Sequence, residues 1–546
     1  MTGSENGNQL QEEIRRQVEA RVQEEAAALP QKDKEIPTLE SGFVLECLEA
    51  NELGDGILYA IINRDRYLYD PGVRSWFSYV GHHYELDSAE THLHAVERVA
   101  DIYLTELRRV GEEKVRAAEE GNKEGVVRLQ KLGRQLTKRI FRLRTDTGRA
   151  ATVKFARTCE HPLVLKDKAF DAEPSLLPCI NGVINLESGK FREGRPTDLL
   201  SKACPVQWGS LDEPCPGFEK WLLEILDGDE AVADYLQRFL GYAITGLRHE
   251  HVFSCWCGRG RNGKGTLVDV LNGVLGPLAG PIRPELLLQD RTTSANQSTP
   301  ALMGLKGLRL AFASETDEAR RFSPAAVKRL TGGDALIGRG NYDRLETRWT
   351  PTHTLILLTN SLPGAPPDDF AFWERMRLIR FPLSFVDRDP SDKSERRARK
   401  GLADQLAYEA SGILAWLVRG CLRYQREGLH APEAVTKATA EYRRSEDMLA
   451  DFLEAHCLIG EHFETRAADA YKRFSSWFEE NISSKGLSQS RFGRAMAKKF
   501  HKRKSSGVFV YEGFMLRPLC VTCERSAVLV DDNGRPLSSK CPDCKS

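Results

Sequence analysis

The sequence lacks an excess of either charge, and it lacks the apolar segments of a membrane or secreted protein. Lysine plus arginine and aspartate plus glutamate both number 78, so only local clusters of charge can indicate a polyanionic partner. No apolar run approaches ~18 residues, and the N-terminus has no basic-then-apolar signal segment. We therefore expect a soluble, cytoplasmic protein with no membrane partner. Its 546 residues suffice for several domains.

The cysteines are too few and too scattered for a disulfide framework. Nine of the 13 occur singly or, like Cys255 and Cys257, within an apolar stretch, which is typical of reduced core residues. The other four form two C-x-x-C pairs with seventeen residues between them: Cys520, Cys523, Cys541 and Cys544. Thiolates at this spacing can close a tetrahedral Zn²⁺ site, and a redox pair is the alternative. Four protein ligands predict a structural zinc ribbon over residues 519–546.

The stretch HVFSCWCGRGRNGKGT, residues 251–266, organises the rest of the chain. Val252 to Trp256 has the pattern of a buried strand, and the residues from Gly258 to Lys264 fit the G-x-x-x-x-G-K phosphate loop. Backbone amides, the positive end of the next helix and the lysine charge together suit a triphosphate. A glycine-rich turn is the structural alternative. The predicted nucleotide-binding residues are Gly258, Gly260, Asn262, Gly263, Lys264, Gly265 and Thr266.

Polar residues after later strands complete the expected site. The buried strand Leu308–Ala313 leads into an acidic segment, in which Glu315 is the best candidate to hold magnesium or polarise the attacking water. A solvated turn is the alternative. Asn360 follows the next apolar strand and can orient the water. Arg375, with Arg377 as runner-up, is either a surface charge or a group that reaches the phosphate bound by a neighbouring subunit.

These segments, in this order, resemble the superfamily III (AAA+) helicases, and most closely the helicase part of phage, plasmid and poxvirus primase-helicases. The resemblance covers about residues 43–518. The matching stretches are LLPCINGVINLESGKF, FLGYAITG, GRGRNGKGT, ASETDE, VKRLTGGD, TLILLTNSLP and FWERMRLIRF. It implies ATP and Mg²⁺ as cofactors and a ring that is usually hexameric.

The resemblance also assigns roles to single residues. It implies that Lys264 is the Walker A lysine, Glu315 the Walker B acid, Asn360 the sensor and Arg375 the arginine finger. Lys328 and the basic hairpin 338–344, with Arg339 and Arg344, match the segment that grips DNA in the pore. Two positions depart from the pattern. Gly265 stands where a serine or threonine usually ligates magnesium, with Thr266 one place late, and Ser314 replaces the first acid of the Walker B pair.

The flanking segments predict further domains around this core. We expect a polar or helical tail over 1–40, an α+β domain over 41–210, a helical collar over 211–245, the AAA+ domain over 246–390 and a helical extension over 391–445. About forty polar residues precede the α+β domain, too few for a primase. The pairs Asp227/Asp229 and Asp387/Asp389 are interpreted as solvated turns. We therefore predict no primase site, and a separate primase or polymerase as partner.

Residues 446–518 have the pattern of a winged helix, which members of the resembled family often carry at this position. A helix and a following segment hold the predicted DNA contacts Arg491, Arg494, Lys498, Lys499, Lys502 and Arg503. Val508–Val510 and Phe514–Leu516 are the expected strand pair. One basic helix beside a basic wing is the electrostatic pattern of duplex binding, and a solvated basic face is the alternative.

The sequence therefore predicts a multidomain α/β protein with a phosphate loop on a parallel sheet. The predicted function is an ATP-driven, ring-forming DNA helicase for replication of a phage, plasmid or integrated mobile element. The main alternative is an origin-binding initiator or regulator that uses ATP only to assemble. A small-molecule kinase would explain neither the basic wing nor Arg375.

Overall fold

The structure is a computed structural model that describes residues 39–165, 170–289, 300–315, 320–340, 346–481, 489–505 and 507–519. The chain divides into two compact units. One ends at Ala169, and the other begins at Phe170 and includes the short segment Gly81–His83. This division precedes the position 210 at which the sequence analysis ended the α+β domain, because the small sheet after Phe170 belongs to the second unit.

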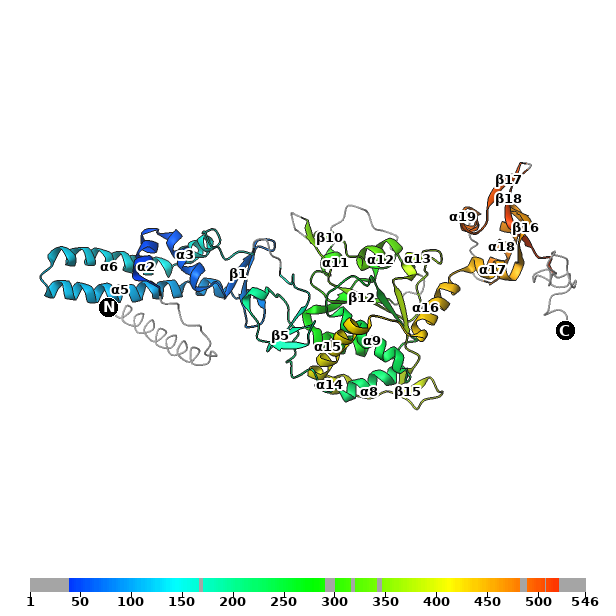
Figure 1. Cartoon of the computed structure of the whole chain (residues 1–546), viewed down its shortest axis with the longest axis horizontal. Helices are drawn as coiled ribbons and strands as arrows, with labels where there is room; N and C mark the ends of the chain where they lie inside the picture. The colour runs from blue at the N-terminus through cyan, green and yellow to red at the C-terminus, as the bar shows by residue number, and fades with distance from the viewer. Residues whose placement is uncertain are drawn as a thin grey trace, which may run out of the picture. The chain divides into compact units, whose positions relative to one another are not determined.

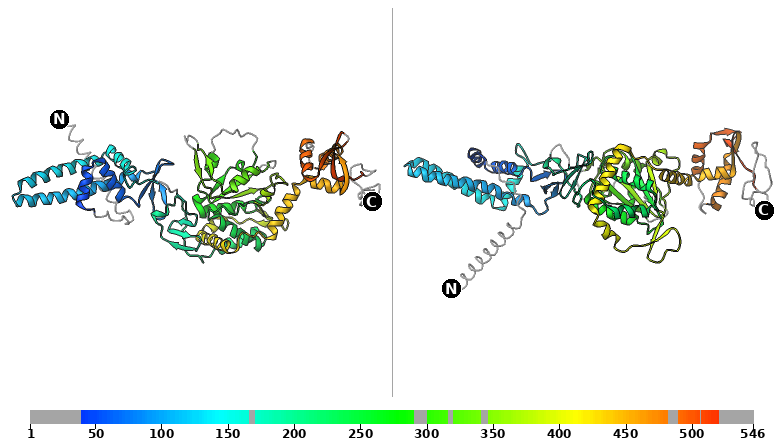
Figure 2. Two further views of the ribbon diagram at one scale, coloured as in Figure 1. Left: turned by 45° about the horizontal axis from the view of Figure 1, so that its top comes forward. Right: turned by 60° about the horizontal axis from the view of Figure 1, so that its bottom comes forward.

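The first unit is a helical domain with a small sheet. Its elements are α2 (Ser41–Glu49), α3 (Glu52–Ile62), β1 (Tyr67–Asp70), β2 (Ser75–Tyr79), β3 (Tyr84–Leu86), α4 (Thr91–His94), α5 (Glu97–Glu119), α6 (Lys123–Leu143) and α7 (Asp146–Ala156). Helices α5 and α6 lie side by side as a long hairpin in both views of Figure 2. The buried carboxylate of Asp55 anchors this hairpin, because it accepts hydrogen bonds from Tyr103 on α5 at 3.0 Å and Arg139 on α6 at 3.2 Å.

The second unit begins with an antiparallel sheet and two helices. They are β4 (Leu176–Cys179), β5 (Gly182–Asn185), β6 (Lys190–Arg192), α8 (Pro216–Ile225) and α9 (Glu230–Ala243). A turn after Asn185 joins β5 to β6. The guanidinium of Arg309 is fully buried and donates to the carbonyls of Pro174 at 2.9 Å and Leu176 at 2.8 Å, which ties the small sheet to the central one.

A five-stranded parallel sheet, ordered β13-β7-β12-β9-β8, forms the centre of this unit (Figure 1). Its strands are β7 (Phe253–Cys257), β8 (Ala279–Ile282), β9 (Leu310–Glu315), β12 (Thr354–Thr359) and β13 (Met376–Arg380). The helices around it are α10 (Lys264–Leu275), α11 (Pro300–Met303), α12 (Pro324–Thr331), α13 (Phe370–Trp373), α14 (Leu402–Ala407), α15 (Ala410–Glu427) and α16 (Glu433–Ser445). Short elements complete it: the 3₁₀ turns Pro196–Asp198, Gly276–Leu278 and Pro284–Leu286, the hairpin β10 (Leu336–Gly338) with β11 (Thr347–Trp349), and the parallel pair β14 (Ser384–Val386) with β15 (Glu395–Arg397).

Both faces of the central sheet are buried, as expected for a parallel sheet. Alternate residues of β12 enter different cores: Ile356 and Leu358 pack with α8, α9, α10 and α15, whereas Leu355 and Leu357 pack with α12, α13 and α16. The predicted strands around the phosphate loop, the acidic segment and Asn360 are thereby confirmed as β7, β9 and β12. The parallel sheet and the division into two compact units also confirm the predicted multidomain α/β class.

The C-terminal part of the described chain has the element order helix–strand–helix–helix–strand–strand. It comprises α17 (Met448–His456), β16 (Cys457–Arg466), α18 (Ala467–Asn481), α19 (Gln489–Lys499), β17 (Lys502–Ser505) and β18 (Val508–Leu516). The predicted pairing of Val508–Val510 with Phe514–Leu516 is wrong, because both belong to β18. This strand lies between β16 and β17, and its hairpin partner is the basic segment Lys502–Ser505.

Two further predictions from composition can be compared with the described residues. The nine scattered cysteines are all free, and eight of them are buried, which confirms their interpretation as reduced core residues. Within the described ranges, no helix combines the length and the apolar composition that a membrane span needs.

Candidate functional site

The loop between β7 and α10 can form only because its key positions are glycines. Gly260 and Gly263 have φ angles of +90° and +83°, in the left-handed region that glycine tolerates. A Cβ atom on Gly263 would lie 2.7 Å from Ile225 Cγ2, and one on Gly258 would lie 2.5 Å from the carbonyl oxygen of Phe381. The loop is therefore pressed between the end of α8 and the chain that follows β13, which fixes its curvature.

Lys264 begins α10 and turns its side chain back under the loop. Its ammonium donates to the carbonyl oxygens of Gly258 at 2.9 Å and Thr359 at 2.7 Å, and lies 3.4 Å from Oδ1 of Asn360. The side chain is buried, and burial lowers the pKa of its amine. The structure thus brings together Lys264 and Asn360, which are ninety-six positions apart in the sequence.

The strand register places the predicted acid at the same edge. Thr359, the last residue of β12, is the register partner of Cys257 at the end of β7 and of Glu315 at the end of β9. The carboxyl ends of these three strands therefore meet beside the loop, which is where ligands bind in open α/β sheets. The structure describes the backbone of Glu315 but not its side chain. Asp317 and Glu318 lie outside the described residues.

The loop carries a buried donor that has no hydrogen-bond partner among the described residues. This donor is Nδ2 of Asn262, whose side chain is 3 % exposed. A buried amide without a partner costs roughly 1–3 kcal/mol. Together with the loop's backbone amides and the start of the twelve-residue helix α10, it suits a ligand rich in acceptor oxygens, such as a polyphosphate.

Residues 265 and 266 decide how a metal could be held. A Cβ atom on Gly265 would have no neighbour within 4 Å, so a hydroxyl-bearing side chain would find space at this position. Thr266, on the same turn of α10, is half-buried, and Ser314 near the end of β9 is exposed. No group of three or more potential metal-ligating His, Cys, Asp or Glu side chains occurs in the part of the chain that the structure describes.

A small pocket next to the loop was not predicted from the sequence. It has a volume of about 160 Å³, and its lining residues are Leu226, Asp229, Val232, Leu378, Ile379, Arg380, Pro382, Ala434 and Val435. The loop contacts both flanks of this pocket, because Ile225 packs on Gly263 and Phe381 packs on Gly258. The position of this pocket follows from the register of β13 on β7, in which Arg380 pairs with Cys257, so that the end of β13 lies beside the loop. A sequence does not reveal that register.

Arg375 lies at the opposite end of the sheet from Lys264. It precedes β13, and its carbonyl accepts from the amide of Phe253, the first residue of β7. The four steps from Phe253 to Cys257 span about 13 Å at ~3.3 Å per residue. Arg375 donates to the carbonyl of Ala371 at 2.7 Å, and its Nε is buried without a partner among the described residues. Arg377 lies inside β13 and donates to the carbonyls of Glu374 and Met376.

Most of the predicted DNA contacts that the structure describes are engaged by acids. Lys328 on α12 pairs with Asp369 at 2.8 Å, and Lys499 pairs with Asp447 at 2.9 Å. Arg503 is held between Glu464 and Glu512. Lys502 lies 4.6 Å from the ring centroid of Phe509, and Arg339 is exposed at the end of β10. These ion pairs do not exclude DNA binding, but they make the net positive charge around these residues smaller than the sequence indicates.

Several predicted residues lie outside the described structure. They are Arg344 and the four cysteines, together with the N-terminal tail over 1–38. Arg491, Arg494 and Lys498 belong to α19, and the structure describes only their backbones.

Comparison with known proteins finds similarity over most of the chain. Residues 57–227 match the family described as "D5 N terminal like". The protein named "Putative helicase L207/L206" of Acanthamoeba polyphaga mimivirus is 26% identical over 476 residues, which is 84% of this chain and 48% of that protein. The chain is similar to proteins named as helicases of large DNA viruses.

Two further relatives show the range of names in this group. "Putative helicase 121R" of Invertebrate iridescent virus 3 is 25% identical over 58% of this chain and 36% of its own length. "Putative primase C962R" of African swine fever virus is 23% identical over 58% of this chain and 34% of its own length. The chain thus spans about half or less of the curated relatives it matches. A solved C-terminal region of NrS-1 covers 55% of this chain and 66% of that structure at 15% identity and a TM-score of 0.35, from which we draw no conclusion.

Proposed function

We propose that this chain contains the motor of an ATP-dependent DNA helicase of superfamily III, which assembles into a ring and unwinds DNA during replication of a virus, plasmid or integrated mobile element. One observation carries the proposal. The ammonium of Lys264, the side-chain amide of Asn360 and the strand that ends in Glu315 meet at one edge of a parallel sheet. Beside them lies a glycine loop with a buried donor that has no partner among the described residues. Two relatives named as helicases support the same proposal, because their similarity covers 84% and 58% of this chain and not the loop alone.

In this mechanism, Lys264, Asn262 and the loop amides hold the β- and γ-phosphates of ATP and neutralise their charge. Glu315 accepts the proton of the attacking water, and Asn360 orients that water. Magnesium, when bound, would supply positive charge that offsets the charge of the phosphates. Thr266 is the candidate side chain on α10, and Glu315 is the candidate at the end of β9.

The small pocket is our candidate for the base of the nucleotide. Its 160 Å³ is less than the ~300–1,000 Å³ typical of whole small-molecule ligands, so it suits a base alone. Most of its lining residues are apolar, and Arg380 and Asp229 are the charged ones. The Oδ1 atom of Asp229 accepts from the amide of Val232 at 3.0 Å. A carboxylate at this position can accept from an exocyclic amino group, which favours adenine.

The proposal also includes the C-terminal segments. The element order of residues 448–516 is that of a winged helix, and we propose duplex DNA as its ligand. For residues 519–546 we propose a structural zinc ribbon, because binding energies of ~10–16 kcal/mol can fold so short a segment. Elemental analysis of anaerobically purified protein should find one zinc ion per chain, and replacing Cys520 and Cys523 with serine should release it. Protein that contains no zinc would contradict this part of the proposal.

Strand displacement on forked DNA tests the helicase function directly. We expect the chain to unwind a fork in the presence of ATP and Mg²⁺. The Glu315→Gln variant should bind ATP and assemble normally, yet it should neither hydrolyse ATP nor unwind the fork, because the amide cannot accept the proton of the water. Hydrolysis without strand displacement in the wild-type chain would instead favour the alternative of an ATP-assembled initiator or regulator.

A further inference from the structure

The helix α6 carries a strong local charge in a chain with no net charge. Seven of its residues are lysine or arginine, and one, Glu124, is acidic. The neighbouring α5 is nearly balanced, with five basic and six acidic residues. The positive charge therefore belongs to one helix of the hairpin and not to the hairpin as a whole.

Four of these cations form one exposed face, which we call the α6 basic face: Arg128, Lys131, Arg134 and Lys138. At ~100° per residue they fall within about a third of the helix circumference, and successive members are ~4.5–6 Å apart along the axis. None of the four makes an ion pair among the described residues. By contrast, Arg139 and Arg142 are used inside the unit, where they bond Asp55 and Glu52. The fold thus pairs two of the seven cations of α6 with acids and leaves the four of the α6 basic face exposed.

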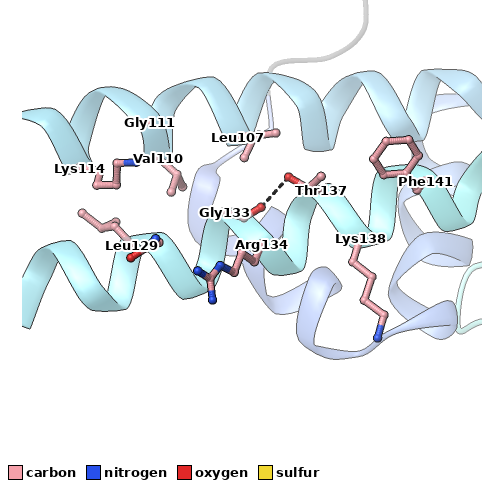
Figure 3. Close-up of a pocket in the computed structure, with 11 residues that line it drawn as sticks. Leu107, Val110, Gly111, Lys114, Leu129, Gly133, Arg134, Thr137, Lys138 and Phe141 are labelled. Atoms are coloured by element: carbon pink, nitrogen blue, oxygen red, sulfur yellow. Dashed lines mark hydrogen bonds between the residues drawn. The ribbon is translucent and has the colours of Figure 1, made fainter.

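Large apolar side chains interrupt this face. Phe141 is 68% exposed and Val127 is 66% exposed, although both lie on a well-formed helix. Beside them runs a shallow groove of about 500 Å³ between α5 and α6, with Leu107, Val110 and Leu129 in its lining (Figure 3). Arg134, Lys138 and Phe141 also line it, so charge and exposed ring belong to the same surface.

We propose that the α6 basic face and Phe141 bind single-stranded nucleic acid. A row of cations at one per turn can follow a phosphate backbone, and an exposed aromatic ring beside it can stack on an unpaired base. A duplex would use the cations but not Phe141 or the groove, because its bases are already stacked. An acidic protein would also fit the charge, but it offers no partner for a single isolated ring. This surface is in the first unit, whereas the nucleotide edge and the winged-helix segment are in the second.

Site-specific crosslinking in the full chain shows which surface contacts the single-stranded nucleic acid. With p-benzoylphenylalanine in place of Phe141, irradiation in the absence of nucleotide should crosslink a poly-dT oligonucleotide. The same substitution at Val115, which is 55% exposed on α5, is the matched control and should crosslink at least about tenfold less. Three outcomes would each overturn the proposal. They are equal crosslinking at both positions, no crosslinking at position 141 while the oligonucleotide is bound, and a preference for duplex over single-stranded DNA. A chain-to-chain crosslink at 141 would assign the surface to self-association instead.

Charge variants measure the contribution of the cations. We expect Arg134→Glu with Lys138→Glu to weaken poly-dT binding and to reduce the salt slope by about 1.4, at ~0.7 per lost phosphate contact. Arg108→Glu with Arg116→Glu on α5 makes the same change in net charge at exposed positions and should leave the slope unchanged. Equal effects from both pairs would show that only net charge matters and would overturn the proposal. Because binding is measured without ATP, this result is independent of the proposed helicase activity.

Discussion

Replacing Lys264 with alanine should lower the rate of ATP hydrolysis on the order of 10²–10³-fold or more, because removal of even one neutral preorganised donor has an effect of this size in other enzymes. The ammonium lies between the loop carbonyl of Gly258 and the side chain of Asn360, where the phosphates are expected, and no second lysine lines this edge among the described residues. Hydrolysis measured by phosphate release, with strand displacement in parallel, checks this result.

Gly265→Ser is the matched control for this variant. It changes the next residue of the same helical turn, and its added Cβ meets nothing within 4 Å. We expect its stability to remain equal or to rise by about 0.5 kcal/mol, since glycine is a poor helix former, with hydrolysis retained. Retained hydrolysis in a folded Lys264→Ala chain would show that the loop is not the phosphate site.

Arg375 should be required for hydrolysis, and it should act on the nucleotide of a neighbouring subunit. Within its own chain it lies at the far end of the sheet from Lys264, so it cannot reach the same phosphates. Arginine fingers supply ~10³–10⁵-fold in rate. Arg375→Ala should therefore abolish hydrolysis, while ATP binding to the variant should remain near the wild-type level.

Mixing two inactive chains distinguishes a role in trans from a structural one. In a mixed ring of Arg375→Ala and Lys264→Ala chains, some interfaces combine an intact loop with an intact arginine, so hydrolysis should partly recover. Arg377→Ala is the control, because Arg377 lies inside β13 and donates to the carbonyls of its own neighbours. Mixtures that co-assemble without recovery would contradict the role of Arg375, and recovery with Arg377→Ala in its place would move the finger by two residues.

The central sheet could be predicted because its strands are apolar runs that end in residues of distinct chemistry. Only β8 was missed, since Gly280 and Pro281 disfavour a strand, and this strand survives at the sheet edge, where an unpaired proline is tolerated. In the C-terminal unit, the aromatic run Val508–Leu516 was divided into two strands at Glu512-Gly513. Gly513 instead has φ +103° within one continuous strand.

The site was predictable as a set of residues but not as an arrangement. Spacing identified the loop and Lys264, whereas the approach of Lys264 to Asn360 and the register of Glu315 follow from strand order, which sequence does not encode locally. The acid partners of Lys328 and Arg503 were missed for the same reason. Asp369 is forty-one positions from Lys328, and Glu464 is thirty-nine from Arg503. Long-range pairing of this kind also forms the small apolar pocket.

Because Lys328 pairs with Asp369, a DNA phosphate can bind Lys328 only by exchanging with the Asp369 carboxylate. Burial raises the pKa of the Asp369 carboxyl. The hydrogen bonds from Lys328 and from the amide of Phe372, with the charges of Lys328 and Arg375, together outweigh it and hold that pKa below its usual range. A pair this exposed is worth ~0–1 kcal/mol, so a phosphate can displace the carboxylate at almost no net cost. The displaced carboxylate then has Arg375 as its remaining cation. Occupancy of Lys328 by DNA and the electrostatic field at Arg375 are therefore thermodynamically linked through one aspartate.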